Sequence, residues 1–171
     1  MYFCRNLVEL LETAEESIDI CLLLLNLENV ADVFLQALYK GIKVRMITDA
    51  HMANLSGSQV SSLIEEGQKM PSTSFSQLKT DAPVFNPSVV SGVAVRGMHY
   101  HTNMHHKFII LDNKLVFFGS FNWSMQALCG NCENLVCTNN SSLVDKFKIQ
   151  FSDMWTEFKP IEVEKIGLRR F

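Results

Sequence analysis

The chain has 171 residues, of which 47% are apolar and 19% are charged. A chain of this length is expected to form one domain, and its apolar share is sufficient for a packed core and excludes intrinsic disorder. Lys and Arg total 15 against 18 Asp and Glu, so the net charge of -3 excludes a histone-like or polybasic protein. The five cysteines are an odd number and do not form the pattern of a disulfide scaffold, which favours a reducing compartment.

The first half of the chain alternates helical and strand patterns, judged from the spacing of its apolar residues. The predicted elements are a helix over 5–16, a strand over 18–25, a helix around 30–38 that Gly41 is placed to end, a strand over 42–48 and a helix over 57–66. This alternation of helices and strands predicts a sheet with helices packed on it.

The pattern dissolves at about residues 68–91, where prolines stand among Ser, Thr, Asn and Asp, and we expect a long irregular loop there. The elements predicted beyond it are strands over 93–96, 107–111, 115–118 and 135–138, a turn over 112–114, and a final helix that a capping box of Ser142 and Asp145 opens. The fold class that follows is α/β, with a mixed, mainly parallel sheet flanked by helices on both faces. Residues 1–171 are expected to form a single domain.

Basic residues are concentrated in one stretch of this acidic chain. No Asp or Glu lies between Ala82 and Leu111, and the basic residues there are Arg96, His99, His101, His105, His106 and Lys107. A patch of this kind indicates an anionic ligand. For the charge alone, however, a solvated basic edge is the simpler interpretation.

The spacing of residues in this region indicates phosphoryl chemistry. His105 and Lys107 are two residues apart, so on a strand their side chains share one face. A neutral imidazole beside a fixed ammonium can attack phosphorus, because the cation offsets charge on the phosphate oxygens and favours the uncharged ring. Ser120 and Asn122, on a strand-to-helix turn, could donate hydrogen bonds to the same oxygens. Glu133 could accept one from the second imidazole nitrogen and stabilise the imidazolium.

Two motifs in this region resemble the signature of the phospholipase D superfamily. They are His105-x-Lys107-x-x-x-x-Asp112 and Gly119-Ser120-x-Asn122-x-Ser124, with Glu133 at the expected spacing downstream. Finer similarity, to the small single-motif members called Zucchini or mitochondrial cardiolipin hydrolase, lies in residues 104–108, 122–127 and 133–135, in Thr48-Asp49 and in Gly57-Ser58-Gln59. The resemblance covers most of the chain except residues 68–98.

The resemblance implies a set of site residues. They are His105, Lys107, Asn122 and Glu133 in catalysis, Ser120 with Lys107 and Asn122 on the phosphate, and Asp112, Gly119 and Ser124 as structural parts of the motif. The turn position of Asp112 indicates that it holds the hairpin rather than touching phosphate. No metal and no cofactor is expected, since lysine supplies the positive charge and the chain shows no carboxylate cluster suited to magnesium. Family members carry a Cys/His zinc-binding element near the start of the domain, but only Cys4 lies upstream here, so no zinc site is expected.

The chain contains one copy of the motif, whereas superfamily enzymes use two. Phosphoryl transfer through histidine needs a nucleophile and, opposite it, a group that protonates the leaving oxygen. A two-fold homodimer with a shared active site would bring both from His105 of each subunit. We therefore expect a homodimer in which one His105 forms a phosphohistidine and the other acts as general acid.

The resemblance favours a single-strand-preferring endoribonuclease of Piwi-interacting RNA biogenesis, with single-stranded RNA or DNA as substrate. The alternative is a phospholipase D-type hydrolase that binds an anionic phospholipid and converts cardiolipin to phosphatidic acid. A catalytically inactive binding module is disfavoured because every expected site residue is present. The implied location is the cytosolic face of the mitochondrial outer membrane, through an anchor outside this chain, whose longest apolar run, 20–25, is far shorter than the about 20 residues of a membrane span. Otherwise a cytoplasmic location is expected.

Other residues with chemical potential are given structural interpretations. Cys129 and Cys132 have zinc-like spacing, but no second pair accompanies them, so they are expected to be loop thiols. His106 should point to the face opposite the proposed nucleophile. Trp123 fits a core position, or a groove edge where it could stack on a base.

Overall fold

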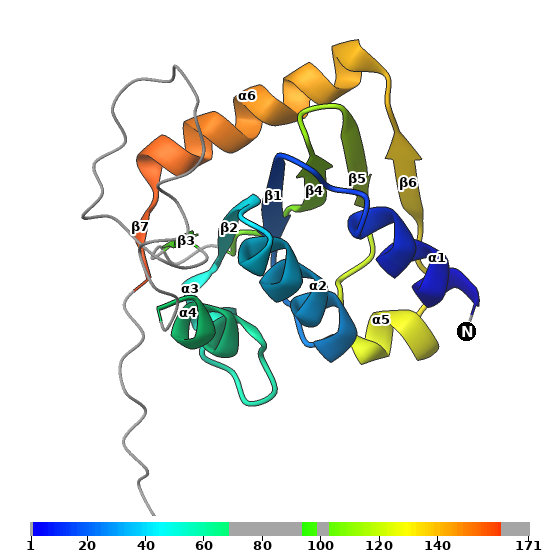
Figure 1. The fold of residues 1–171 in the computed structure, drawn as a ribbon. Coiled ribbons are helices and arrows are strands. Elements are labelled where there is room, and N and C mark those ends of the chain that lie inside the picture. Colours follow the sequence, from blue (N-terminus) through cyan, green and yellow to red (C-terminus); the bar gives the residue numbers. More distant parts are fainter. Residues whose placement is uncertain (1, 69–93, 99–102, 162–171) are drawn as a thin grey trace, which may run out of the picture.

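The computed structural model describes residues 2–68, 94–98 and 103–161 (Figure 1). The elements are α1 (Tyr2–Leu11), β1 (Ser17–Leu22), α2 (Glu28–Tyr39), β2 (Lys43–Asp49), α3 (Ala50–Ala53), α4 (Val60–Gln68), β3 (Ala94–Met98), β4 (Lys107–Leu111), β5 (Leu115–Gly119), α5 (Met125–Cys129), β6 (Leu135–Thr138), α6 (Ser141–Glu157) and β7 (Lys159–Pro160). Nearly all of the loop predicted at 68–91 lies outside the described residues, as do His99 and His101. None of the helices in these three ranges is long and apolar enough to cross a membrane.

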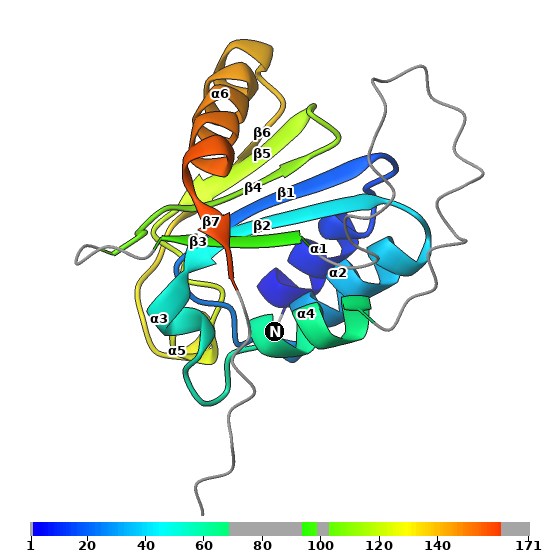
Figure 2. The same ribbon diagram turned by 90° about the vertical axis from the view of Figure 1, so that its left-hand side faces the viewer.

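Seven strands form one sheet in the order β6-β5-β4-β1-β2-β3-β7. Figure 2 shows α1, α2 and α4 on one face of this sheet and α6 on the other, which confirms the α/β class with helices on both faces. The expectation of a mainly parallel sheet is wrong: β1–β2 and β2–β3 are parallel, while β1–β4, β4–β5, β5–β6 and β3–β7 are antiparallel. The reason is that β4, β5 and β6 follow one another without a crossover that returns the chain to the same end of the sheet, so consecutive strands must reverse direction.

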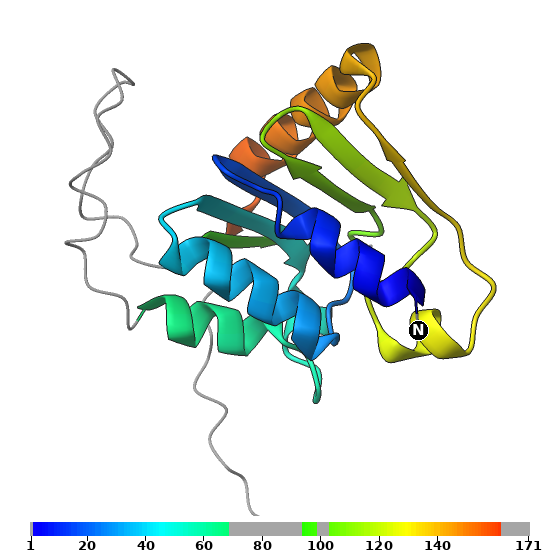
Figure 3. The same cartoon turned by 45° about the vertical axis from the view of Figure 1, so that its right-hand side comes forward.

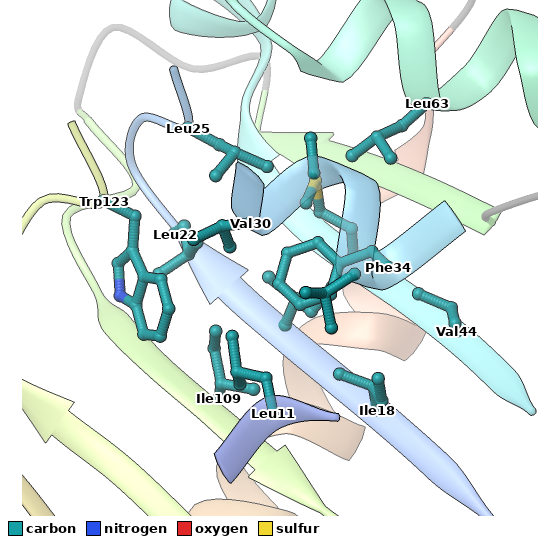
Figure 4. Close-up of a cluster of buried hydrophobic side chains, with 14 of the residues drawn as sticks. Leu11, Ile18, Leu22, Leu25, Val30, Phe34, Val44, Leu63, Ile109 and Trp123 are labelled. Atoms are coloured by element: carbon teal, nitrogen blue, oxygen red, sulfur yellow. The ribbon is translucent and has the colours of Figure 1, made fainter. Parts of the chain in front are cut away.

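The larger part of the core lies between the sheet and the layer of α1, α2 and α4. Leu11, Phe34 and Leu63, one from each of these three helices, lie in one buried cluster with Ile18 and Ile109 of the central strands (Figure 4). Alternate residues of each strand face this layer, as the period of two requires. Each such side chain stabilises the fold by about 1.5–3 kcal/mol when fully buried.

Helix α6 is held to the opposite face by two arginines. Arg45 forms an ion pair of 2.6 Å with the buried Asp19, and its guanidinium lies over the ring of Trp155. Arg96 stacks on the same ring and donates to the carbonyl oxygens of Trp155 (2.6 Å) and Phe158 (3.0 Å). Arg96, which the sequence placed in the basic patch, is therefore used to anchor α6.

Several element ends differ from the prediction. The first helix ends at Leu11 rather than at residue 16. The backbone N–H groups of Glu15 and Glu16 donate to the side chain of Asp112 instead of to carbonyl oxygens of the helix. The prediction of a capping box formed by Ser142 and Asp145 is wrong. Asn140 is the N-cap of α6, and its side chain accepts a hydrogen bond of 3.1 Å from the N–H of Leu143. Helix α3 and strand β7 were not predicted, because four and two residues are too short to show a period.

Candidate active site

The predicted site residues gather at one edge of the sheet. Strand β4 runs antiparallel to β1, so it begins where β1 and β2 end, and β5 ends and β6 begins at this same edge. Lys107 begins β4 and His105 lies two residues before it, Ser120 and Asn122 follow β5, and Glu133 precedes β6 by two residues. Figure 2 shows α3 and α5 at this end of the strands. Strand order therefore brings together residues that are up to 28 positions apart.

His105 and Lys107 are in direct contact. Lys107 Nζ lies 3.1 Å from Nδ1 and 3.4 Å from Nε2 of His105, and donates to the His105 carbonyl oxygen at 2.9 Å. An ammonium can only donate, so the ring nitrogen that it approaches must hold its lone pair. Burial lowers the pKa of Lys107, and the negative charge of Glu133 opposes that effect. The result is a buried cation against an exposed imidazole.

Met104, the residue before His105, is held by contacts with the neighbouring strands β2 and β1. Asp49, buried at the end of β2, accepts a hydrogen bond of 3.2 Å from the backbone N–H of Met104 and also caps α3. The side chain of Met104 is buried and its Sδ lies 3.5 Å from Sγ of Cys21 in β1. Asp49 therefore positions the backbone at His105. Sequence reasoning noted Asp49 only through the resemblance, although an acidic residue ending an apolar strand was a usable signal.

Asp112 holds the far end of β4. Asp112 and Asn113 form the hairpin turn with φ of 51° and 56°. The Asp112 carboxylate accepts hydrogen bonds from the backbone N–H groups of Glu15 (3.0 Å), Glu16 (2.7 Å) and Ser17 (2.8 Å). Burial by itself raises the pKa of Asp112, but these donors outweigh it and the pKa lies below its usual value. The role as a structural residue, away from the site, agrees with the expectation from the turn.

Gly119 allows β5 and β6 to approach closely at the site. A Cβ there would lie against the carbonyl oxygen of Asn134, 3.0 Å from its carbonyl carbon and 3.2 Å from Cα of Leu135. Ser120 and Asn134 form two hydrogen bonds across this short distance. The N–H of Ser120 donates to Asn134 Oδ1 (2.9 Å), and the N–H of Asn134 donates to the hydroxyl oxygen of Ser120 (3.0 Å). The glycine of the motif is therefore required by strand spacing.

The turn from β5 to α5 is held by a buried tryptophan, a helix cap and hydrogen bonds to Asn26. Trp123 is fully buried at one end of the core cluster (Figure 4), so it is a core residue rather than a stacking surface. Ser124 caps α5, and Asn26 binds both sides of the turn, donating to the Trp123 carbonyl oxygen (3.1 Å) and accepting from the Met125 N–H (3.0 Å). Among the described residues the buried Oδ1 of Asn122 has no hydrogen-bond partner, which leaves this side chain an unused acceptor at the site.

Glu133 is held by two donors. The hydroxyl of Ser120 donates to Oε2, and Asn131 Nδ2 donates to Oε1 at 2.8 Å. These hydrogen bonds, with a smaller effect of the Lys107 charge, lower the pKa of Glu133. The described hydrogen bonds of Glu133 do not include His105, so that pairing stays a prediction. The hydroxyl proton of Ser120, assigned from the sequence to a phosphate oxygen, is engaged by Glu133 here.

The remaining candidates occupy structural positions. His106 lies edge-on to Phe108, 5.6 Å between ring centroids, on the α6 face and thus opposite His105. Cys129 and Cys132 are exposed free thiols. Within the described residues no group of three or more His, Cys, Asp or Glu is placed to hold a metal ion.

Comparison with known proteins identifies relatives over most of the chain. A family model described as cardiolipin synthase, PLD-like domain, matches residues 7–155. Proteins named mitochondrial cardiolipin hydrolase are similar: that of Chlamydomonas reinhardtii is 32% identical over 152 residues (89% of this chain, 57% of the relative), and that of Homo sapiens 28% over 155 residues (91% and 52%). The chain spans little more than half the length of these two relatives.

Two solved structures share the fold. Nuc from Salmonella typhimurium, described as a phospholipase D family member, superposes with a TM-score of 0.70 at 22% identity, covering 91% of this chain and 89% of that one. NucT from Helicobacter pylori gives 0.69 at 24% identity, with 92% and 89% covered.

Proposed function

The chain belongs to the family of phospholipase D-like domains, and from this premise we propose that it is a metal-independent phosphodiesterase acting through a phosphohistidine. The observation that carries the proposal is the contact of His105 with Lys107 at the edge where Asn122 and Glu133 also stand. Attack on a phosphodiester requires a nitrogen with an available lone pair next to a cation, and His105 and Lys107 supply these two groups.

Each of the four residues has a defined part in the reaction. The neutral ring of His105 attacks phosphorus, and a bond forms between a ring nitrogen and the phosphorus atom. Lys107 and the amide of Asn122 offset the charge that develops on the non-bridging oxygens. Glu133 supplies a carboxylate that stabilises positive charge on the imidazole and on Lys107. Together these groups replace the charge that a divalent cation supplies in other phosphodiesterases.

A second subunit completes the reaction. As the bond between phosphorus and the leaving oxygen breaks, that oxygen takes a proton from the protonated His105 of the second subunit. The second His105, now neutral, removes a proton from water; the resulting hydroxide attacks phosphorus and the bond to the first His105 breaks. One chain holds a single His105, and a two-fold homodimer is the simplest assembly that presents two.

The proposed substrate is single-stranded RNA or DNA, on the resemblance to the Zucchini group and its role in Piwi-interacting RNA biogenesis. The second candidate is cardiolipin, an anionic phospholipid, because the curated relatives are named mitochondrial cardiolipin hydrolase. The same relatives support a mitochondrial location, which we propose to be the cytosolic face of the outer membrane. Both substrates present a phosphodiester, so His105 and Lys107 would act identically on either.

Purified protein tests the activity and the substrate together. Labelled single-stranded RNA, single-stranded DNA, duplex RNA and cardiolipin vesicles are each incubated with excess chelator, with His105→Ala as control. We expect cleavage that survives chelation and is lost in the control, and ³²P transferred from substrate to protein in wild type only. Activity that chelator abolishes and magnesium restores would refute the phosphohistidine mechanism.

The shared active site has its own test. Wild-type and His105→Ala subunits are mixed one to one and re-equilibrated. If both copies of His105 are needed, only wild-type pairs are active and about a quarter of the activity remains, whereas independent subunits keep about half. An active monomer in a sedimentation experiment at assay concentration would rule the dimer out.

A further inference from the structure

The exposed connection between α5 and β6 contains a side chain that reaches the proposed catalytic carboxylate. Figure 3 shows this connection on the outside of the molecule. We propose that Asn131, which it carries, is a positioning residue that fixes the orientation of the Glu133 carboxylate toward Lys107. The inference rests on the proposed function in that it gives Glu133 its place in the reaction.

Asn131 bridges two side chains. Its Nδ2 donates to Oε1 of Glu133 at 2.8 Å, and its Oδ1 accepts from Nε2 of Gln126 at 3.1 Å. The two ends of the amide differ, one donating and the other accepting, so this pair of contacts specifies which way the side chain faces. Gln126 therefore orients Asn131, and Asn131 orients Glu133.

The backbone keeps these three side chains in register. The N–H groups of Gly130 (2.9 Å) and Asn131 (3.0 Å) both donate to the carbonyl oxygen of Gln126 as α5 ends. Gly130 leaves room for the bridge, because a Cβ there would stand 2.5 Å from Nε2 and 3.1 Å from Cδ of Gln126. The turn thus places Asn131 by main-chain contacts that do not depend on Glu133.

The second oxygen of the carboxylate is held by a residue from a different segment of the chain. Ser120 donates its hydroxyl to Oε2, while Asn131 holds Oε1, so rotation of the carboxylate would break at least one of the two hydrogen bonds. Glu133 is only partly covered, and water competes for a hydrogen bond at such a position. Two donors from separate segments therefore fix the orientation of the carboxylate, whereas a single solvent-exposed hydrogen bond would leave it free to rotate.

The charge that acts on Glu133 comes from β4, which is separated from β6 by β5 in the sheet. Lys107 of β4 is the charged residue acting on it within the described parts of the chain, and Ser120 and Asn131 are its neutral donors. These three groups lower the pKa of Glu133. Loss of the Asn131 donor should therefore raise that pKa toward the ordinary value of about 4.3.

The first test is independent of enzymatic activity. The side-chain carboxyl carbon of Glu133 is followed by ¹³C NMR against pH in wild type, Asn131→Ala and Asn131→Asp. The pKa should rise in Asn131→Ala, and rise further in Asn131→Asp, which keeps the size but opposes one carboxylate with another. Asn139→Ala and Asn139→Asp are matched controls, since Asn139 is also exposed but follows the far end of β6. An unchanged Glu133 pKa in both Asn131 variants would overturn the proposal.

The second test is a double-mutant cycle on a chromogenic phosphodiester. Asn131→Ala should lower kcat about tenfold with little change in KM, because a misplaced group weakens the transition state more than substrate binding. In the Glu133→Gln background the same change should have no further effect. Equal losses in both backgrounds would show that Asn131 acts on stability or on another group, and would overturn the proposal. An inactive wild type would refute the proposed function, and the titration would still decide the role of Asn131.

Discussion

Replacing Gly119 with alanine tests whether the closeness of β5 and β6 builds the site. The added methyl would meet backbone atoms, namely the carbonyl group of Asn134 and Cα of Leu135, and not a flexible side chain that could move aside. The strands must therefore separate where β6 begins. That separation stretches the reciprocal hydrogen bonds between Ser120 and Asn134 and moves Glu133, the residue before Asn134, away from the Ser120 hydroxyl.

The magnitude follows from these contacts. Overpacking a close-packed position costs about 1–3 kcal/mol, and one weakened hydrogen bond adds about 1 kcal/mol, so we expect a loss of about 2–4 kcal/mol. For a domain of this size each kcal/mol lowers Tm by about 2–4 °C. Gly41→Ala is the matched control: nothing lies within 4 Å of the added Cβ, but its φ of +83° makes alanine strained by about 1–2 kcal/mol. Gly41 precedes β2, at the opposite edge of the sheet from the site.

The assay compares Tm with activity at a temperature where every variant is folded. Both glycine variants should melt earlier than wild type, but only Gly119→Ala should lose activity, by at least about tenfold, because the geometry around Ser120 and Glu133 is disturbed. A Gly119→Ala variant as active as Gly41→Ala would refute the reasoning. So would an unchanged Tm, since it would mean that the strands absorb the methyl without separating.

Three further predictions concern single side chains. Asp112→Asn should destabilise the fold by about 1–2 kcal/mol at pH 7. Because the folded-state pKa of Asp112 is lowered, this stabilisation is present above its ordinary pKa of about 4 and is lost as the pH falls through the folded-state value, so urea unfolding of variant and wild type should converge at low pH. Lys107→Ala should lower kcat about 10²–10³-fold, as expected when a preorganised charge is removed, with the folded state verified by circular dichroism. Asp49→Ala should lower both Tm and kcat, because it frees the N–H groups at α3 and at Met104, whereas Asp32→Ala on the exposed side of α2 should lower neither.

Local patterns determined those features that depend on a residue's own neighbours in the chain. The spacing of His105 and Lys107 predicted that their side chains lie on the same side, and the two are in contact, although His105 lies two residues before β4 rather than within it. The turn position of Asp112 indicated a structural role, and its backbone there is left-handed, as aspartate tolerates. The order of strands and helices likewise gave the α/β class before any contact was known.

Tertiary structure alone decided how segments distant in the chain meet. The bond from Met104 to Asp49 crosses 55 positions and that from Glu15 to Asp112 crosses 97, so neither leaves a periodic signal. The pairing of Glu133 with His105 stays a prediction, whereas the hydrogen bonds of Glu133 with Ser120 and Asn131 come from the approach of β6 to β5 and from the turn after α5. Side-chain periodicity is a property of a few consecutive residues, whereas these pairings depend on strand order and register, which hydrophobic burial sets for the whole chain at once.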